Sequence, residues 1–456
     1  KYPLQKHSLN NRKLPPGVII VPVKQRYRED GFLIHLLGHV GQSLEKPVLQ
    51  GDAGLEKRYD STLKGKQAQE VVAVVNGMGQ PIAGLTPKSK DDSETVEYAV
   101  VTTIDKRTQA IVEKVMDQRV TSGAVVVMNI KNRDILAMAS RPTYNPYNPA
   151  SYQGNTESAW LLNRALTPFY PGSVFKIVVA AAALENHAID STAEFYCPGS
   201  YRYSSRLTIP CWKQNGHGKV NLEQALAESC NVAFIEMGLK VGRTRLLELC
   251  RRVHLAEQEI IGYSDTQSGS HVAIDYGRPA LGNATLGQQG VYLTPVQISN
   301  LIATLASNGV YKRPRLVIQT WGKGNTRIYY PPDRGEKVLN QAVCNELCRY
   351  LCQVTAYGTG KNADLPGVGC GGKTATSQTG HYTSAGEEVL NTWFTGFFPA
   401  DNPQWVVTVL VEHGQSGGYN AAPVFKEIAE GILEQSAQYE PTLKEKGNKN
   451  NLANDL

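Results

Sequence analysis

The chain has 456 residues, of which 41% are hydrophobic, so it can bury one large core and a second, smaller one. Its 47 Lys and Arg residues against 41 Asp and Glu residues give a formal net charge of +6, which is spread along the chain. This pattern argues against nucleic acid as a partner and favours an anionic surface. No stretch approaches the ~20 apolar residues of a membrane span, and the chain begins with a lysine, so we expect a piece of a longer protein.

Residues 1–95 are rich in charge, Gly and Gln, with short strand-like runs such as GVIIVPV at 17–23. They predict a small, irregular, extended domain with β-strands. Residues 86–95 are mostly charged or hydroxylated and contain no apolar repeat, so we place a domain boundary there.

The second predicted domain spans 96–436. It begins with a helix capped by Thr103, followed by a hairpin around the turn KNRD at 131–134, whose first strand is apolar on both faces. Helical segments follow from about 157 to 254, and two strands and a closing helix occupy 391–435. The fold class we expect is α+β, with one antiparallel sheet assembled from distant segments and packed against a helical cluster. The polar residues 437–456 predict a disordered tail.

Ser173 and Lys176 stand at the start of an apolar, Ala-rich helical stretch that follows Pro171. Side chains three residues apart lie on one helix face, so the lysine can reach the serine oxygen. A lysine that burial keeps neutral can activate a serine hydroxyl, and a helix N-terminus directs backbone N–H groups at a developing oxyanion. By itself, however, the S-x-x-K pattern favours the simpler interpretation, a capping serine with a lysine in the first turn.

Two further motifs follow in the chain. Ser229 and Asn231 flank Cys230 after a helix that starts at Asn221 with a capping box, and Lys373 and Thr374 begin what we expect to be an exposed strand. Each could be an ordinary turn or loop. The set S-x-x-K, Ser-x-Asn and Lys-Thr-Gly nevertheless characterises serine acyl-transfer enzymes that react with penicillins, and the three motifs occur here in that order.

With these motifs, the chain resembles the class B, monofunctional penicillin-binding proteins over nearly its whole length. The stretches NRALTPFYPGSVFK, LGQQGVYLTPVQ and WFTGFFP look like that family, and HLLGHVG and GLEKRYD resemble its pedestal. The resemblance implies a peptidoglycan D,D-transpeptidase on the outer face of a bacterial cytoplasmic membrane, with its anchor missing from this chain. It also implies stem peptides derived from lipid II as substrates, β-lactams as inhibitors, a membrane glycosyltransferase as partner, and no cofactor.

The resemblance implies a role for each motif residue. Ser173 would be the nucleophile, Lys176 the general base, Ser229 a proton relay, and Asn231 the group that holds Lys176 and the substrate. Lys373 with Thr374 would bind the terminal carboxylate. The backbone N–H groups of Ser173 and Thr376 would form the oxyanion hole.

One position departs from the family pattern, since Ala375 replaces the glycine of K-T-G. A methyl group on this strand could tighten the site or twist the strand, which puts β-lactam affinity in question. A β-lactamase, a β-lactam sensor and a catalytically silent scaffold are the alternatives. The first two leave the pedestal unexplained, and Ala375 is the feature that favours the third.

Other candidate residues have simpler interpretations. Glu336 to Asn340 matches the E-x-x-L-N pattern of class A β-lactamases, but it precedes a helix far from the Ser-x-Asn motif, and we interpret it as a helix start. Cys344, Cys348 and Cys352 recur every four residues on that helix and predict a stripe of small apolar side chains.

Cys197, Cys211 and His217 precede the Ser-x-Asn motif. They could form a disulfide, three zinc ligands or unpaired core thiols. We place the disulfide first because the implied compartment is extracytoplasmic, and keep the metal site as a weak candidate.

Overall fold

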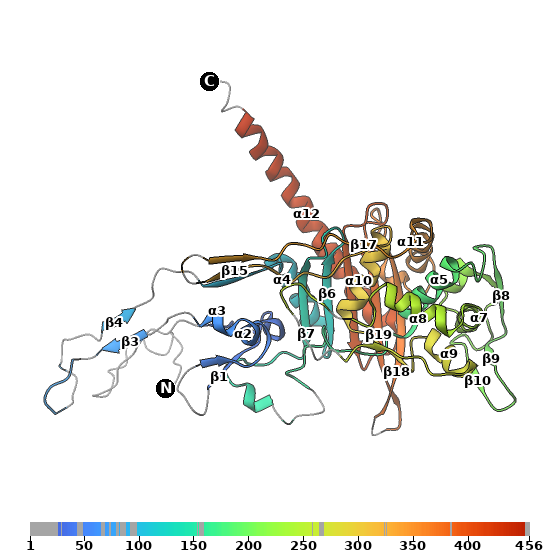
Figure 1. Ribbon diagram of the computed structural model, residues 1–456, viewed down its shortest axis with the longest axis horizontal. Coiled ribbons are helices and arrows are strands. Elements are labelled where there is room, and N and C mark those ends of the chain that lie inside the picture. Colours follow the sequence, from blue (N-terminus) through green and yellow to red (C-terminus); the bar gives the residue numbers. More distant parts are fainter. Residues whose placement is uncertain are drawn as a thin grey trace.

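The structure is a computed structural model of the 456-residue chain (Figure 1). It describes residues 26–28, 30–42, 49–64, 69–72, 74–78, 82, 88–91, 98–152, 154, 159–257, 259–263, 269–322, 324, 326–383 and 385–451. The strand predicted at 17–23 and part of the boundary predicted at 86–95 lie outside these residues.

A five-stranded antiparallel sheet forms the centre of the molecule, in the order β18-β19-β20-β6-β7. Its strands are β18 (Gly371–Tyr382), β19 (Glu388–Phe398), β20 (Trp405–Glu412), β6 (Gly123–Asn129) and β7 (Ile135–Arg141). The predicted α+β fold with strands from both ends of the domain in one sheet is therefore confirmed. The sheet places β18, which carries Lys373, at an open edge.

Both faces of the sheet are buried, which explains the continuous apolar run in β6. Ala124, Val126 and Met128 of β6 belong to a core shared with the helical cluster, whereas Val125 and Val127 face a second core. Side chains alternate between the two faces of a strand, so a strand buried on both sides must be apolar at every position. The second core is closed by α4 (Lys106–Arg119) and α12 (Ala422–Asn451).

The start of α4 differs from the prediction. Asp105, rather than Thr103, caps the helix, and its carboxylate accepts a hydrogen bond from the backbone N–H of Thr108. Thr103 instead donates its hydroxyl to the carbonyl oxygens of Ile135 and Arg315. A capping residue must precede the first helical turn directly, and tertiary contacts move that turn two residues along the chain.

Helices of the second half of the fold gather on the other face of the sheet, to one side of it in Figure 1. They are α5 (Lys176–Glu185), α6 (Leu222–Ala227), α7 (Asn231–Val241), α8 (Arg243–Arg252), α9 (Arg278–Thr285), α10 (Pro295–Ala306) and α11 (Gln341–Ala356). α10 packs against the sheet, and α5 lies within this cluster, which is why nearly all of its residues are apolar.

Short strands surround these helices. They are β8 (Glu194–Cys197), β9 (Ser200–Arg202), β10 (Thr208–Pro210), β11 (Gly218–Asn221), β12 (His271–Val272), β13 (Val291–Tyr292), β14 (Val310–Tyr311) and β17 (Glu336–Lys337). A separate three-stranded sheet contains β5 (Ala99–Thr102), β15 (Val317–Gly322) and β16 (Thr326–Tyr329). Of the single-turn helices, η3 (Gly172–Phe175) and η6 (Gly417–Ala421) contribute to the site, and η2 (Pro149–Tyr152) and η5 (Lys361–Ala363) lie in connecting loops.

The described residues between 26 and 91 form short helices and short strands. The elements are α1 (Ile34–Leu37), β1 (Val40–Gln42), β2 (Leu49–Gly51), α2 (Gly54–Arg58), α3 (Asp60–Leu63), β3 (Gln69–Val72) and β4 (Lys88–Asp91). The N–H of Leu33 donates to Glu113 of α4 over 2.8 Å, and the hydroxyl of Tyr59 donates to the carbonyl of Gly262 over 2.5 Å. These bonds fix the region against the sheet domain.

The last helix extends past the predicted end of the second domain. Helix α12 spans Ala422–Asn451, whereas we placed that end at residue 436. The apolar first half of this helix packs into the second core. In the described part of the chain, no helix combines the length and the apolar character needed to cross a bilayer.

Candidate active site

Ser173 lies on η3, a single 3-10 turn that leads directly into α5. Gly172 starts the turn with a φ of +54°, a conformation that favours glycine. Residues three apart eclipse each other in a 3-10 turn, so Ser173 and Lys176 face the same side, as predicted. Ser173 is half-buried between fully buried neighbours. Its hydroxyl is thus fixed in position yet reachable.

Lys176 is the first residue of α5 and is completely buried. Its Nζ lies 2.7 Å from Oδ1 of Asn231, 2.8 Å from the carbonyl oxygen of Ser229 and 3.2 Å from Oγ of Ser229. The ring of Phe234 covers it at 5.4 Å from the ring centroid. A neutral amine has two N–H donors and one lone pair. The amide and the carbonyl take the two donors, which leaves the lone pair to accept a proton from a hydroxyl.

Ser229 lies on the tight turn between α6 and α7, and Asn231 is the first residue of α7. The predicted capping box at Asn221 and Gln224 starts α6, and Cys230 is the N-cap residue of α7. Ser229 has a φ of +55°, a strained conformation for a residue other than glycine. Asn231 also donates from Nδ2 to the carbonyl oxygen of Pro210 over 3.1 Å. The turn therefore directs both side chains toward Lys176.

Lys373 is completely buried, so the prediction of an exposed strand at this position is wrong. Its Nζ donates to Oγ of Ser229 and to the carbonyl oxygen of Thr374, each over 3.0 Å. The preceding glycines have a packing role, because a Cβ at Gly371 or Gly372 would lie 2.4 or 2.5 Å from ring atoms of β19. The hydroxyl of Ser229 thus bridges two buried lysines from distant parts of the chain.

The turn that carries Ser173 packs against β18. A Cβ on Gly172 would lie 3.3 Å from the Cβ of Ala375 and 3.2 Å from that of Ser377. The methyl group of Ala375 is buried and occupies space that the missing side chain of Gly172 leaves open. The alanine therefore fits between strand and turn, and the structure gives it no contact that would block Ser173.

Thr374 and Thr376 lie near the same edge. The hydroxyl of Thr374 is 2.5 Å from that of Thr359, and Thr376 accepts a hydrogen bond from the N–H of Gly417 over 3.3 Å. Thr374 is buried and Thr376 is exposed. The carbonyl of Thr376 would lie 3.3 Å from a Cβ on Gly172, which places this residue beside the serine turn.

The two lysines have unusual acidity. Burial lowers the pKa of Lys176 to about 8, although nearby Cys230 and Cys211 oppose the shift. Burial also lowers the pKa of Lys373 well below its usual value, and the charge of Lys176 adds to the effect. Two ammonium groups beside one hydroxyl would repel each other in a buried site. The pair therefore favours the state in which only one of the two amines is protonated.

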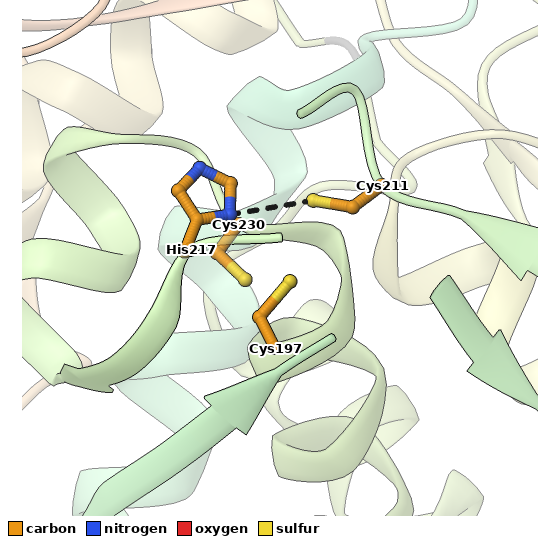
Figure 2. A group of neighbouring side chains, drawn as sticks. All are labelled: Cys197, Cys211, His217 and Cys230. Atoms are coloured by element: carbon orange, nitrogen blue, oxygen red, sulfur yellow. Dashed lines mark hydrogen bonds between the residues drawn. The ribbon is translucent and has the colours of Figure 1, made fainter. Parts of the chain in front are cut away.

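The cysteine group differs from the prediction. Cys197 and Cys211 are free thiols, so the structure contains no disulfide between them. They converge instead with His217 and with Cys230, and the four potential ligand atoms all lie within 4.8 Å of one another (Figure 2). The sequence analysis missed Cys230, because it considered this residue only as the middle of the Ser-x-Asn motif.

The remaining candidates behave as interpreted. Glu336 lies on β17, and Asn340 is the N-cap of α11, so this stretch is indeed a helix start. The carboxylate of Glu336 contacts His254 rather than the lysines. Cys344, Cys348 and Cys352 lie along α11 as buried or half-buried thiols.

Gly287 is a second residue that the sequence analysis missed. Its carbonyl accepts the N–H of Gly172 over 3.0 Å, and a Cβ at this position would lie 2.0 Å from the carbonyl oxygen of Gly172. Its φ is +70°. A glycine in the stretch LGQQG gives a weak signal for a turn, but nothing local indicates that it supports the serine turn.

A serine beside two lysines that share a second hydroxyl, at the open edge of an antiparallel sheet, is the arrangement of serine acyl-transfer enzymes that react with penicillins. The family described as the penicillin binding protein transpeptidase domain matches residues 123–430, and the penicillin-binding protein dimerisation domain matches residues 4–98. The chain belongs to the penicillin-binding protein transpeptidase family, and with its dimerisation region it is a class B member.

Curated relatives and solved structures agree with this assignment. Stage V sporulation protein D of Bacillus subtilis is 29% identical over 89% of this chain and 63% of its own length. Peptidoglycan D,D-transpeptidase PbpA of Mycolicibacterium smegmatis is 31% identical over 69% of this chain and 68% of its own. The imipenem acyl-enzyme of penicillin-binding protein A from M. tuberculosis superposes with a TM-score of 0.70, at 24% identity, over 87% of this chain and 90% of that one. The chain therefore spans roughly two thirds of these curated relatives.

Proposed function

We propose that this protein is a peptidoglycan D,D-transpeptidase that cross-links stem peptides through an acyl-enzyme on Ser173 and is inhibited by β-lactams. The observation that carries the proposal is the hydroxyl of Ser229, 3.2 Å from Nζ of Lys176 and 3.0 Å from Nζ of Lys373. This hydroxyl connects two buried amines beside the serine turn. The names of the relatives as transpeptidases support the same reaction.

In the proposed reaction, Oγ of Ser173 attacks the penultimate D-Ala carbonyl and transfers its proton to Lys176. The proton then passes through Ser229 to the leaving nitrogen, and the terminal D-Ala departs. The amine of a neighbouring stem peptide then attacks the acyl-enzyme and forms the cross-link. The ester bond to Oγ of Ser173 breaks, and the proton that the amine loses passes through Lys176 to that oxygen, which regenerates the serine. No step requires a redox change, because the reaction exchanges one amide for another.

The two lysines have different roles in the proposed reaction. The substrate ends in a carboxylate, and a negative charge near Lys373 favours the ammonium form there. Lys373 then carries the charge that binds the carboxylate, and Lys176 can act as the base only after it has lost its own proton.

The residues of β18 complete the proposed site. The ammonium group of Lys373 attracts the terminal carboxylate by its charge, and the hydroxyl of Thr374 orients the carboxylate through a hydrogen bond. The backbone N–H groups of Ser173 and Thr376 form the oxyanion hole, and removal of one such donor typically costs about 3–4 kcal/mol of transition-state stabilisation. The position of Thr376 beside Gly172 supports this pairing.

The proposal includes a location and partners. Stem peptides derived from lipid II exist outside the cytoplasmic membrane, so the enzyme works on the extracytoplasmic face of that membrane. A membrane glycosyltransferase that polymerises the glycan strands would supply its substrate. The net charge of +6 is compatible with work beside an anionic surface.

The decisive experiment is covalent labelling with a fluorescent penicillin. We expect one adduct per chain on Ser173 that persists for minutes or longer, because the tethered leaving group of the opened lactam excludes an attacking amine. Ser173→Ala should abolish the adduct. Ser204→Ala, a change to an exposed serine on the loop between β9 and β10, should leave it unchanged.

Other outcomes would select the alternatives. Rapid turnover of penicillin would indicate that the protein is a β-lactamase rather than a transpeptidase. A folded protein that takes no label would indicate a silent scaffold. Release of D-Ala from a stem-peptide analogue in the presence of an amine acceptor, lost in Ser173→Ala, would separate the transpeptidase from a β-lactam sensor.

The rate of acylation should depend on pH through Lys176. Its pKa is lowered to about 8, and only the neutral amine can accept the serine proton. The rate of adduct formation should therefore rise about tenfold per pH unit below pH ~7.5 and level off above pH ~8.5. Stopped-flow measurements from pH 6 to 9.5, corrected for hydrolysis of free penicillin, would show this rise, and a flat or falling profile between pH 6.5 and 8 would exclude Lys176 as the base.

A further inference from the structure

Thr359 lies outside the three motifs but contacts the elements that carry two of them. It belongs to the loop after α11, in the stretch YGTG at 357–360. Its hydroxyl is 2.5 Å from the hydroxyl of Thr374 on β18, and its N–H donates to the carbonyl oxygen of Ala227 over 3.1 Å. Ala227 ends α6, two residues before Ser229. Thr359 therefore connects β18 with the turn that follows α6.

Glycines on two sides hold the backbone of Thr359 in place. A Cβ on Gly358 would lie 2.4 Å from the carbonyl oxygen of Ala227, and a Cβ on Gly418 of η6 would lie 2.5 Å from the carbonyl oxygen of Thr359. Such close approach of the backbone requires that these two side chains be absent. Threonine is also β-branched, which restricts its χ1 angle. The hydroxyl of Thr359 therefore has little freedom to turn away from β18.

The orientation of the Thr374 hydroxyl depends on Thr359. Thr374 is buried, and in the part of the chain that the structure describes its hydroxyl has no other hydrogen-bond partner. A hydroxyl has one proton to donate and two lone pairs that accept. If Thr374 donated its proton to Thr359, it would have none left for a carboxylate. Thr359 must therefore be the donor of this pair when Thr374 donates to a carboxylate.

The distances favour Thr359 as the donor. Among the described residues, the other acceptor near its hydroxyl is the carbonyl oxygen of Ala227, 3.4 Å away, which already accepts the N–H of Thr359. Hydroxyl donors prefer separations of about 2.7–2.8 Å, so the contact with Ala227 is long and the contact with Thr374 is short. The proton of Thr359 is therefore directed at Thr374, and the proton of Thr374 remains available to a ligand.

We propose that Thr359 is a positioning residue for recognition of the substrate carboxylate. Its hydroxyl donates to Thr374 and thereby directs the single proton of Thr374 toward the terminal carboxylate of the peptide. This inference rests on the proposed function and adds to it the group that orients the carboxylate donor. The ligands concerned are peptides and β-lactams with a free carboxylate, because a hydrogen bond to a charged acceptor is stronger than one to a neutral acceptor.

Thr359→Val tests this role, because it removes the hydroxyl and keeps the branched shape. The substrate is a D-alanyl thioester of thioglycolate, which ends in a free carboxylate. We expect the second-order rate constant of thiol release to fall about tenfold, the effect of losing a hydrogen bond to a charged group. The rate of labelling by penicillin, which also carries a carboxylate, should fall equally. Thr359→Ser keeps the hydroxyl and should retain most of both rates.

The methyl ester of the same thioester removes the charge that Thr374 would bind. With this ester, Thr359→Val should react within about twofold of the unchanged protein, because a neutral group gains little from the directed proton. A threonine that serves only the packing of the loop would give the same loss with both compounds. An equal loss with thioester and ester would therefore overturn the inference.

A double-mutant cycle gives a second, independent measurement. In a Thr374→Val background, Thr359→Val should cause no further loss of the labelling rate, because the proton that it directs is already absent. Additive losses would contradict the inference. If the ester reacts too slowly to be measured in the unchanged protein, this cycle decides the question. If Thr359→Val does not fold, Thr359→Ala takes its place in both measurements with the same expected results.

Thr355→Val is the matched control. Thr355 on α11 donates its hydroxyl to the carbonyl oxygen of Cys370, just before β18, over 2.7 Å, rather than to Thr374. This variant should lower the free energy of unfolding but keep the ratio of thioester to ester rates of the unchanged protein. A Thr359→Val rate within about twofold of the unchanged protein with the free carboxylate would refute the inference alone. A folded, unchanged protein that neither releases thiol nor takes the penicillin label would refute the proposed function instead.

Discussion

Replacement of Lys176 by methionine is expected to slow acylation by penicillin about 10²–10⁴-fold, the range that general-base catalysis contributes. Methionine keeps the volume of the buried stem but removes the amine. The hydroxyl of Ser173 then lacks its proposed base. The carbonyl oxygen of Ser229 and Oδ1 of Asn231 lose the amine that donates hydrogen bonds to them. Rates of adduct formation with a fluorescent penicillin, measured over a range of concentrations, would show the loss.

Lys240→Met is the matched control for this change. Lys240 lies on α7 with its Nζ 5.5 Å from the ring centroid of Phe195, much as Lys176 lies over Phe234 at 5.4 Å. This variant loses a lysine over an aromatic ring but none of the proposed machinery, and it should acylate at the normal rate. A rate for Lys176→Met within threefold of the unchanged protein would remove Lys176 from the mechanism.

Replacement of Gly287 by alanine should disrupt the turn that carries Ser173, although Gly287 lies outside the three motifs. The new Cβ would lie 2.0 Å from the carbonyl oxygen of Gly172 at a φ of +70°. Backbone strain and overpacking together should lower the free energy of unfolding by about 2–5 kcal/mol. Because the clash moves the residue next to Ser173, acylation should also slow by more than tenfold, to an extent that the loss of stability does not explain.

Gly367→Ala is a control that should have the backbone strain of the Gly287 variant but not its steric clash. Gly367 has a similar φ of +77°, but nothing lies within 4 Å of its missing Cβ. This variant should lose only about 1–2 kcal/mol and acylate normally in the folded state. Chemical denaturation and labelling rates of both variants give the comparison. Equal losses in both would mean that Gly287 has no special contact with the serine turn.

The candidate site residues could be predicted from short motifs in the sequence. Ser173, Lys176, Ser229, Asn231 and Lys373 lie in short motifs whose order and spacing fit one kind of enzyme. The capping box at Asn221 and the continuous apolar run in β6 likewise predicted their elements, because each signal depends on neighbours along the chain. The family resemblance supplied the roles that the motifs alone left open.

Other properties depend on contacts between distant segments. Lys373 follows a glycine run that locally suggests an exposed strand, yet the rings of β19 and the helical cluster bury it. The effect of Ala375 could not be judged until Gly172, some two hundred residues earlier, was found to leave room for its methyl group.

The sequence by itself predicted the nucleophile, its lysine and the class of reaction, because those residues are close together in the chain or occur in recognisable motifs. The tertiary structure alone decided the burial and acidity of the two lysines, the support of the serine turn by Gly287, and the meeting of Cys230 with three residues of other loops. The physical reason is that pKa values and ligand geometry arise from desolvation and from distances in space, which a spacing along the chain does not contain.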